Sequence, residues 1–574
     1  MVITHGIQLA DNPPLIGGEV DWVHDMAQAM ITRQQGANPL APFNVTTYTW
    51  GDAFQPCSGF TSCIDPTNLT TVYQAARNAD PSTVTHGFNL AKNLLELNPT
   101  DDIHFVGHSS GTHVNAFAAL GLAALGKPVK QFTILDRPFG RVLTPGPTDD
   151  DLFRDALPSG QVTWVDNYYG NAVAGTGVPL EGLPPALSGT PLPAAYNHFL
   201  NKTHSGVHEW YTNTINAASS EGFYWSEEGG GFAGRPGPDW TPGNIYPSPT
   251  TITRWNGGSG NWNDDSNWDP QAVPNRLSSI DTINDNFDVQ IGTGSSVAID
   301  TTVEIQDLSI VAGSSVEVEN GQSLILTSDL RANFGSGVGV SLIKNNGNFV
   351  LNSTGFSTKL LIDGVAALRG DGTLLMSDQS QNTTRGIGSD NWLVNEQDHR
   401  IEGAGKLGDG TLGLINGGDI AATGTAPLIV RPDSTLGMLN GGRLMASGGG
   451  TLRLEGNIDN MLDGRIEAQS SSRVDVLSGS VITGGTLQAQ DGGMVEFVNG
   501  ALRRGTLTTL GTGVARAKGS TTLEDVTLKG TLRGLNGSSI TLRGTLTNNG
   551  VVSLNSTGSY TGLWVDGDVT LAGT

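Results

Sequence analysis

The sequence predicts two architectures in one chain: a mostly parallel sheet with flanking helices, followed by an all-β solenoid. In roughly the first 230 residues, short β-favouring runs alternate with stretches of helical periodicity, which is typical of parallel α/β sheets. After Pro274 only two prolines occur in 300 residues, and a scarcity of proline suits a long array of hydrogen-bonded strands. The triplet Gly-Thr-Leu also recurs seven times in the second half, between short alternating segments.

Composition limits the possible functions and the number of domains. The chain has 574 residues and a formal net charge of −24, without a basic stripe, so a nucleic-acid partner is not expected. Its length requires more than one domain. We expect an α/β domain at 1–228, a Gly/Pro-rich linker at 229–254, and a repetitive solenoid at 255–574 that continues beyond the end of this sequence.

The first domain is predicted to be an ordered series of strands and helices. Because the chemistry of a parallel sheet lies beyond the carboxyl ends of its strands, residues that follow the strands are site candidates. Four residues meet this condition: Gly6, Ser109, Asp136 and Asp166. Strands are expected at 2–4, 43–50, 103–106, 131–135 and 162–165. Helices are expected at 19–33 and 114–125, and one or two helices within 68–97.

The most informative motif is Gly107-His108-Ser109-Ser110-Gly111, which lies between an apolar run and an Ala/Leu-rich helix. Strand, Gly-x-Ser-x-Gly and helix form the context of a nucleophile elbow, in which glycines permit a sharp turn with the serine at its apex. The Ser110 amide and the helix N-terminus would then face developing negative charge. We interpret Ser109 as a nucleophile.

A serine hydroxyl becomes a good nucleophile when a base takes its proton and a carboxylate orients that base. The expected chain order on this sheet is nucleophile, acid, histidine. Asp136 follows the next strand, and Asp166 after a later strand is a competing acid. His204 and His208 are the candidate bases. The structural alternatives are a plain turn residue for Asp136 and a helix-face residue for one histidine.

These segments give residues 2–220 a specific resemblance to the α/β-hydrolase superfamily, and within it to pancreatic-type lipases. His5-Gly6 is similar to the His-Gly of the family's oxyanion loop, which implies that the amides of Ile7 and Ser110 bind the oxyanion. The resemblance implies a secreted serine carboxylic-ester hydrolase that acts on an ester or lipid, with no metal and no cofactor.

The same resemblance assigns the triad. The segment 133–138 is similar to the one in which Leu-Asp-Pro carries the acid, here Asp136, although Arg137 stands between the aspartate and the proline. The segment that begins at His204 is similar to the one that starts with the triad histidine, so His204 matches and His208 does not. Family members have strands before the His-Gly loop. These strands and any export signal are expected to be missing here, so we expect an N-terminally truncated sheet with an exposed edge.

Two cysteines, Cys57 and Cys63, bracket a short loop. Either a disulfide or two free thiols fits this spacing, and no His or further Cys stands beside them at a metal-ligand distance. We expect the disulfide, which would place the protein outside the cytoplasm, secreted or at the cell surface.

The second half carries a longer repeat. Residues 345–364 match residues 548–567 at 12 of 20 positions, and both copies contain Leu-Asn-Ser-Thr-Gly. Most Gly-Thr-Leu spacings suit one or two turns of a solenoid, although a Gly- and Thr-rich chain can also repeat such triplets by chance. In style this half resembles the β-helical regions of large secreted bacterial proteins, which implies contacts with a cell surface or matrix.

A second functional class therefore stays open. The chain could be a surface adhesin or structural protein whose hydrolase domain is vestigial or binds without turnover. The intact Ser-Asp-His set favours the enzyme, and the bulk of solenoid and the missing early strands favour the adhesin.

Overall fold

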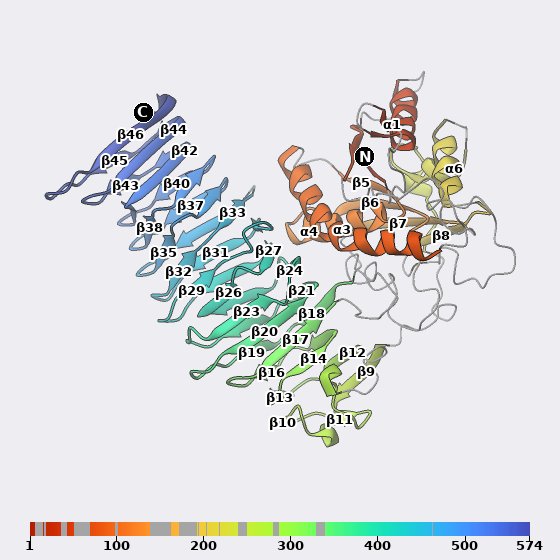
Figure 1. The fold of residues 1–574 in the computed structure, drawn as a ribbon, viewed down its shortest axis with the longest axis horizontal. Coiled ribbons are helices and arrows are strands. Elements are labelled where there is room, and N and C mark those ends of the chain that lie inside the picture. The colour runs from red at the N-terminus through yellow and green to blue at the C-terminus, as the bar shows by residue number, and fades with distance from the viewer. Residues whose placement is uncertain are drawn as a thin grey trace. The chain divides into compact units, whose positions relative to one another are not determined.

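The computed structural model places the chain in two compact units, one essentially within residues 1–249 and one within residues 250–574 (Figure 1). Each unit is described by itself. The described residues are 1–5, 15–16, 19–35, 43–50, 69–97, 102–137, 162–170, 192, 195–202, 204–216, 219–238, 250–278, 286–328, 339–461 and 463–574.

The first unit is built on a six-stranded sheet in which all pairings are parallel. The strand order is β4-β1-β5-β6-β7-β8, so the direction of winding reverses between β1 and β5. Ligands of open parallel sheets bind beyond the carboxyl ends of the strands at such a switch point. The strands are β1 (Val2–Thr4), β4 (Thr46–Tyr48), β5 (His104–His108), β6 (Val129–Leu135), β7 (Val162–Tyr169) and β8 (Tyr196–Phe199), and a short ribbon pairs β2 (Leu15–Ile16) with β3 (Glu19–Val20).

Helices cover this sheet. On one face, Val106 of β5, Leu135 of β6 and Tyr168 of β7 pack with helices α1 and α6 in a single buried cluster. The described helices include none that is both long enough and apolar enough to span a bilayer. The α-helices are α1 (Asp21–Gln34), α3 (Leu69–Leu97), α4 (Gly111–Ala124) and α6 (His204–Asn216), and short 3-10 turns follow at Gly222–Trp225 and Phe232–Gly234.

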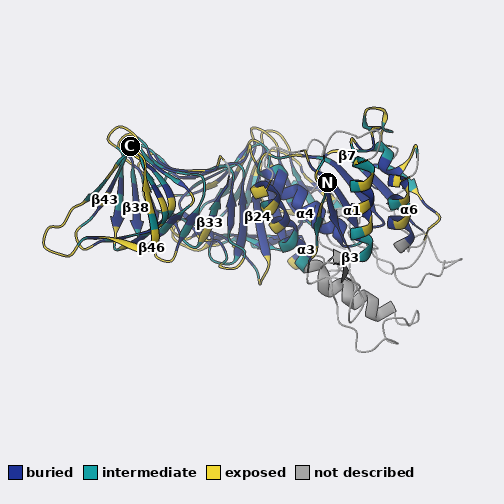
Figure 2. Cartoon of the chain, turned by 90° about the horizontal axis from the view of Figure 1, so that it is seen from above, coloured by how far each residue is buried: buried dark blue, intermediate teal, exposed yellow. Residues whose placement is uncertain are grey.

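The second unit is a β-solenoid, as predicted, in which parallel strands stack along three faces. The inward side chains of all three faces form one continuous apolar core. Figure 2 shows buried residues in strands along the solenoid. The first face contains β9 (Thr250–Trp255), β12 (Asn286–Ile291), β15 (Asp307–Ile310), β18 (Ser341–Asn345), β21 (Val365–Arg369), β24 (Asn391–Asn395), β27 (Leu412–Asn416), β30 (Met438–Asn440), β33 (Asn457–Asn460), β36 (Val481–Thr483) and β39 (Ala501–Arg503).

The second face adjoins the first, and the last three strands run through both of them. These long strands are β42 (Ser520–Lys529), β44 (Ser539–Asn548) and β46 (Gly562–Ala572). The other strands of the second face are β10 (Ser259–Asn261), β13 (Ser296–Ile299), β16 (Ser315–Val318), β19 (Asn348–Leu351), β22 (Thr373–Met376), β25 (Arg400–Gly403), β28 (Asp419–Ala422), β31 (Arg443–Ala446), β34 (Arg465–Ala468), β37 (Thr486–Ala489) and β40 (Thr506–Thr509).

The third face is a separate 12-stranded sheet. It contains β14 (Val303–Ile305), β17 (Ser323–Thr327), β20 (Thr358–Asp363), β23 (Asn382–Gly386), β26 (Gly405–Gly408), β29 (Leu428–Val430), β32 (Thr451–Leu454), β35 (Arg473–Val476), β38 (Met494–Val498), β41 (Val514–Lys518), β43 (Thr531–Gly534) and β45 (Val551–Leu554).

The first turn of the solenoid is closed by tryptophans. Trp268 meets Trp255 and Trp262 edge-on, with ring centroids 4.9 and 4.8 Å apart, and all three side chains are buried. The strand β11 (Trp268–Asp269) pairs antiparallel with β9 and so lies along one edge of the first turn. An edge that is already paired is protected from pairing with another chain.

The turns of the solenoid differ in length, and this hides the repeat in the sequence. Stacked partners are 19 residues apart where Asp288 pairs with Asp307, and 35 apart where Leu308 pairs with Ile343. Most copies of Gly-Thr-Leu stand at the start of a strand, although the copy at Gly544 lies inside β44. The spacing of 20 between the copies at Gly485 and Gly505 is one turn, because Thr486 pairs with Thr506. Other copies start strands of the third face, so the triplet has no single period.

The longer repeat also falls on different faces. In the first copy it forms β19 of the second face, and in the second copy it forms β45 of the third face. The local geometry is nevertheless the same. The Oδ1 atoms of Asn345 and Asn548 each accept a hydrogen bond from the amide two residues later, at 3.1 Å in both copies. The repeat therefore encodes a corner and a strand rather than a position in the turn.

A ladder of buried asparagines closes the ends of four first-face strands. Each Nδ2 donates to the Oδ1 of the asparagine one turn on, from Asn395 to Asn416, Asn440 and Asn460, at 2.7–2.8 Å. His399 extends the ladder, because its Nδ1 lies 2.7 Å from Asn395 Oδ1. Burial lowers the pKa of His399 to about 3, so this imidazole is neutral at pH 7.

Breaking this ladder should destabilise the solenoid. In Asn416→Leu, the buried Nδ2 of Asn395 loses its ladder acceptor and the buried Oδ1 of Asn440 loses its ladder donor. We expect the free energy of unfolding to fall by about 2 kcal/mol, as measured by guanidinium denaturation. The exposed Asn555 provides the control, and Asn555→Leu should change stability by less than about 0.5 kcal/mol. Equal effects of the two substitutions would show that the ladder contributes no stability.

Candidate active site

A sharp turn from strand to helix is present between β5 and α4, with the geometry that the motif predicts. Ser109 follows the last residue of β5 and has φ +53°, in the left-handed region that L-residues rarely adopt. Its amide donates to the carbonyl of Leu135 at 3.2 Å, and its own carbonyl accepts from the Thr112 amide at 2.9 Å. The side chain of Ser109 is partly exposed and that of Ser110 is buried. A strained, accessible serine at a strand-to-helix turn is the geometry that the motif predicts.

Both flanking glycines are required by close packing. A Cβ on Gly111 would lie 2.5 Å from the carbonyl oxygens of Thr4 and His5, and a Cβ on Gly107 would lie 2.8 Å from Asn115 Nδ2. The first contact also places the residues directly after β1 against the start of α4. The last described residue of this segment, His5, therefore lies beside the elbow, and Ile7 lies outside the described residues.

Asp136 occupies the corresponding position on the next strand. It follows β6, it is buried, and its φ is +42°. Because His108 pairs with Leu135, the residues after them, Ser109 and Asp136, leave neighbouring strands at the same level. Strands in a sheet are about 4.8 Å apart. Among the described residues of the first unit, these are the only two non-glycine residues with positive φ.

One oxygen of the Asp136 carboxylate is fixed. Its Oδ1 accepts from the amide of Gly170, directly after β7, at 2.8 Å. Gly170 in turn packs against the loop after β8, since a Cβ there would lie 2.5 Å from the carbonyl oxygen of Lys202. Lys202 is two residues before His204, so a single chain of contacts runs from Asp136 to the segment that carries the predicted base.

His204 is the first residue of α6. This helix follows β8, so its N-terminus lies at the carboxyl edge of the sheet, as does the N-terminus of α4. The side chain of His204 is outside the described residues. His208 lies one turn further along the helix, where its buried ring meets His108 at 4.7 Å and stacks on Trp22 at 4.4 Å between centroids. His208 therefore packs against rings within the core, whereas His204 lies at the N-terminus of α6, at the carboxyl edge of the sheet.

Asp166 is not at a strand end, and this expectation was wrong. β7 continues to Tyr169, and Asp166 pairs with Thr133 in its interior. Its Oδ1 accepts from Thr133 Oγ1 at 2.8 Å and from Gln131 Nε2 at 3.3 Å. Burial raises the pKa of Asp166 to about 6. The strand continues through Asn167 to Tyr168 and Tyr169, whose aromatic side chains favour β structure, and this removes Asp166 from the edge where Ser109 lies.

Asp166 belongs to a buried polar cluster that the sequence did not reveal. Thr133 Oγ1 also lies 2.9 Å from His104 Nε2, and His104 Nδ1 lies 3.1 Å from Glu228 Oε2. Burial opposes the charge on Glu228, but the charge interaction and hydrogen bond with His104, a backbone hydrogen bond and the N-terminal charge together outweigh it, and the pKa of Glu228 is lowered to about 2. Glu228 is 124 residues from His104 in the sequence, so no local motif could signal this pair.

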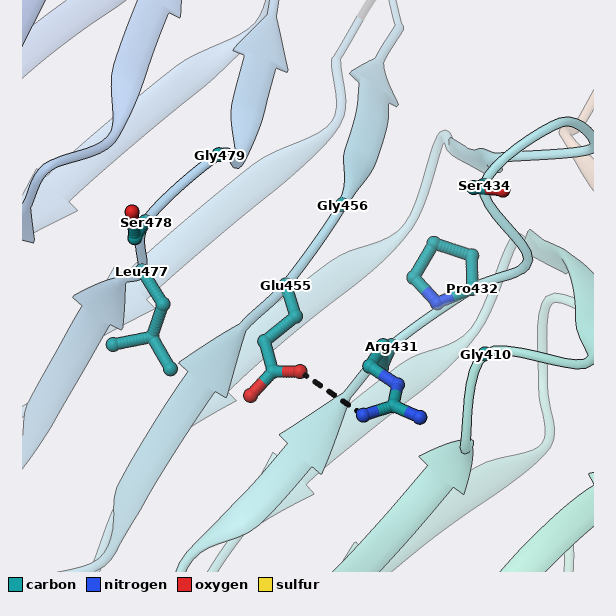
Figure 3. Close-up of a pocket in the computed structure, with 9 residues that line it drawn as sticks. All are labelled: Gly410, Arg431, Pro432, Ser434, Glu455, Gly456, Leu477, Ser478 and Gly479. Carbon is teal, nitrogen blue, oxygen red and sulfur yellow. Dashed lines mark ion pairs between the residues drawn. The ribbon is translucent and has the colours of Figure 1, made fainter.

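The remaining candidates lie elsewhere. Cys57 and Cys63 fall outside the described residues, so their disulfide stays a prediction. On the solenoid, a shallow pocket opens beside Arg431 and Glu455, which form an ion pair at 3.7 Å (Figure 3). Its lining residues hold no nucleophile with an adjacent base. The pocket is lined by Gly410, Arg431, Pro432, Ser434, Glu455, Gly456, Leu477, Ser478 and Gly479.

Comparisons with known proteins do not identify a family. No family model matches the chain, and no curated protein matches it. One solved structure, a hyper-glycosylated fragment of TibA modified by TibC, aligns with 57% of this chain and 95% of its own, at 12% identity and a TM-score of 0.20. At that TM-score the likeness says nothing about the function of this chain. The resemblance to α/β hydrolases stays a prediction.

Proposed function

We propose that the first unit is a serine carboxylic-ester hydrolase. The observation that carries this proposal is the pairing of Ser109 and Asp136 at the carboxyl ends of adjacent strands, each in a strained left-handed conformation. Such strain costs about 1–3 kcal/mol per residue and gathers at functional sites. Two strained residues of the types that a catalytic triad needs, next to a sheet switch point, favour a catalytic reading over a turn.

The proposed chemistry assigns one role to each residue. His204 takes the proton of Ser109 as the hydroxyl attacks the ester carbonyl, and Asp136 orients the imidazole. The amides of Ile7 and Ser110 stabilise the oxyanion. His204 then protonates the departing alcohol, and water releases the acyl group by the reverse sequence. The substrate is an ester or lipid, and no cofactor takes part.

Covalent labelling tests this proposal directly. A fluorophosphonate probe reacts with serines that a neighbouring base activates. We expect the full chain to gain one probe adduct, which peptide mass mapping places on Ser109. His204→Gln should slow labelling at least about 100-fold, and His208→Gln should leave its rate within about two-fold. No adduct on Ser109 in a folded chain would remove the hydrolase.

A second function, of another class, is supported by the second unit. The solenoid is the larger unit, with one continuous core and a closed first turn, and it needs no catalysis to act as a surface adhesin or structural stalk. With a secreted or cell-surface location, its partners would be cell-surface or matrix components. Labelling of Ser109 would favour an enzyme carried on a stalk, and its absence would favour the adhesin with a vestigial domain.

A further inference from the structure

Three helices of the first unit begin at the edge of the sheet where Ser109 lies. α4 and α6 follow strands β5 and β8 directly, and α1 connects the adjacent parallel strands β1 and β4. A helix that connects parallel strands runs back along the sheet from the carboxyl edge. Residues in the first turn of α1 are therefore placed near the nucleophile, and Trp22 is the second residue of this helix.

The indole of Trp22 is linked to the elbow by ring contacts. It stacks on His208 at 4.4 Å with an interplanar angle of 26°, and it meets His108 edge-on at 5.5 Å. His108 directly precedes Ser109, and its side chain is buried. Trp22 is thus one packed side chain away from the backbone that holds the nucleophile.

Part of the indole stays accessible. His108 and His208 are buried, whereas Trp22 is only partly buried at the margin of the core cluster. A flat, polarisable ring whose buried side is braced by two imidazoles loses little entropy on binding a ligand. Tryptophan in such a setting provides large apolar contact area and favours offset or edge contacts with other aromatic rings.

From this placement we propose that Trp22 forms an aromatic subsite for the acyl group beside Ser109, so that esters of aromatic acids are preferred over acetate esters. This inference rests on the proposed ester hydrolysis for its effect on turnover. Trp22 touches the substrate but takes no part in the chemistry, so it determines specificity.

Kinetics of the full chain test this subsite with p-nitrophenyl benzoate and p-nitrophenyl acetate, which share a leaving group. In Trp22→Ala we expect kcat/KM for the benzoate to fall about ten-fold and kcat/KM for the acetate to change by less than two-fold. Trp22→Phe should retain most of the preference. Trp210 is the matched control, because it is also partly buried at the margin of the same core but packs on Tyr168 and His198. Trp210→Ala should leave the benzoate-to-acetate ratio unchanged.

A binding measurement separates this inference from the proposed function. Indole NMR signals of the full chain, with that of Trp22 assigned from Trp22→Phe, are followed while sodium benzoate or sodium acetate is added. A shift of the Trp22 signal with benzoate alone supports the subsite even if no ester is turned over, in which case the hydrolase fails and the subsite stands. Turnover with an equal loss for both esters in Trp22→Ala, or no benzoate-specific shift, overturns the subsite and leaves the hydrolase intact.

Discussion

Replacing Ser109 by alanine should reduce ester hydrolysis at least about 10⁴-fold without unfolding the protein. The hydroxyl is the proposed nucleophile, and the loss of one member of a triad removes most of the catalysis above the contribution of the oxyanion hole. Alanine and serine are disfavoured to a similar extent at φ +53°, so the stability of Ser109→Ala should stay within about 0.5 kcal/mol of the natural protein. Turnover of p-nitrophenyl esters and thermal unfolding measure the two quantities.

Ser109→Gly makes this prediction sharper. Glycine adopts positive φ without a steric penalty, so this variant should be more stable than Ser109→Ala by about 1 kcal/mol and equally inactive. The pair would show that the elbow keeps a strained serine for its chemistry. Turnover that survives in both variants would mean that another group carries out the hydrolysis, and a glycine variant no more stable than the alanine variant would contradict the strain.

Replacing Asp166 by asparagine should raise the stability of the first unit at pH 7.5 by about 3 kcal/mol. Burial raises the pKa of Asp166 from 3.8 to about 6, so ionising it in the folded state costs about two pKa units more than in the unfolded chain. The stability associated with its neutral form is fully present below pH 3.8 and is lost as the pH rises through 6. Asparagine stays neutral and keeps an oxygen for Thr133.

Urea denaturation at pH 3.5 and at pH 7.5 measures this difference. The gain for Asp166→Asn should be absent at the lower pH and full at the higher one. The charge interaction with His104 lowers the pKa of Asp166, so His104→Gln in the natural background should raise that pKa further and steepen the loss of stability between pH 4 and 7. An asparagine variant that is less stable at pH 7.5 would instead show that the ionised Asp166 stabilises the fold through His104.

The sequence predicted those parts of the site whose signals are local. The elbow could be anticipated because Gly107 and Gly111 are needed within two residues of Ser109, and Asp136 because an apolar strand ends directly before it. The end of β7 could not, since Asn167 and the two tyrosines after it suit a strand interior as well as a loop. The pairing of His104 with Glu228 depends on how distant segments pack, which neither periodicity nor a motif records.

In the solenoid, too, features with local sequence signals could be predicted and the others could not. Its strand type follows from alternation and turn residues, which act within a few positions. Its turn length does not, because insertions at the corners change the spacing from 19 to 35 residues without disturbing the stacked strands. Prediction from the spacing of Gly-Thr-Leu therefore found the class of fold and one true turn, at Gly485 and Gly505, but not a constant period.

The two copies of Asn-Asn-Gly precede strands on different faces of the solenoid, and this suggests how a solenoid gains length during evolution. A duplicated segment does not have to supply a whole turn. Each copy contains the asparagine, Asn345 or Asn548, whose side chain accepts the hydrogen bond at its own corner. Because strands stack in parallel on every face, a copied fragment can pair with the previous turn on another face, one third of a turn out of phase. Gene duplication can thus lengthen a solenoid in steps smaller than its structural repeat, and ancestral periods in these proteins should be sought among corner motifs.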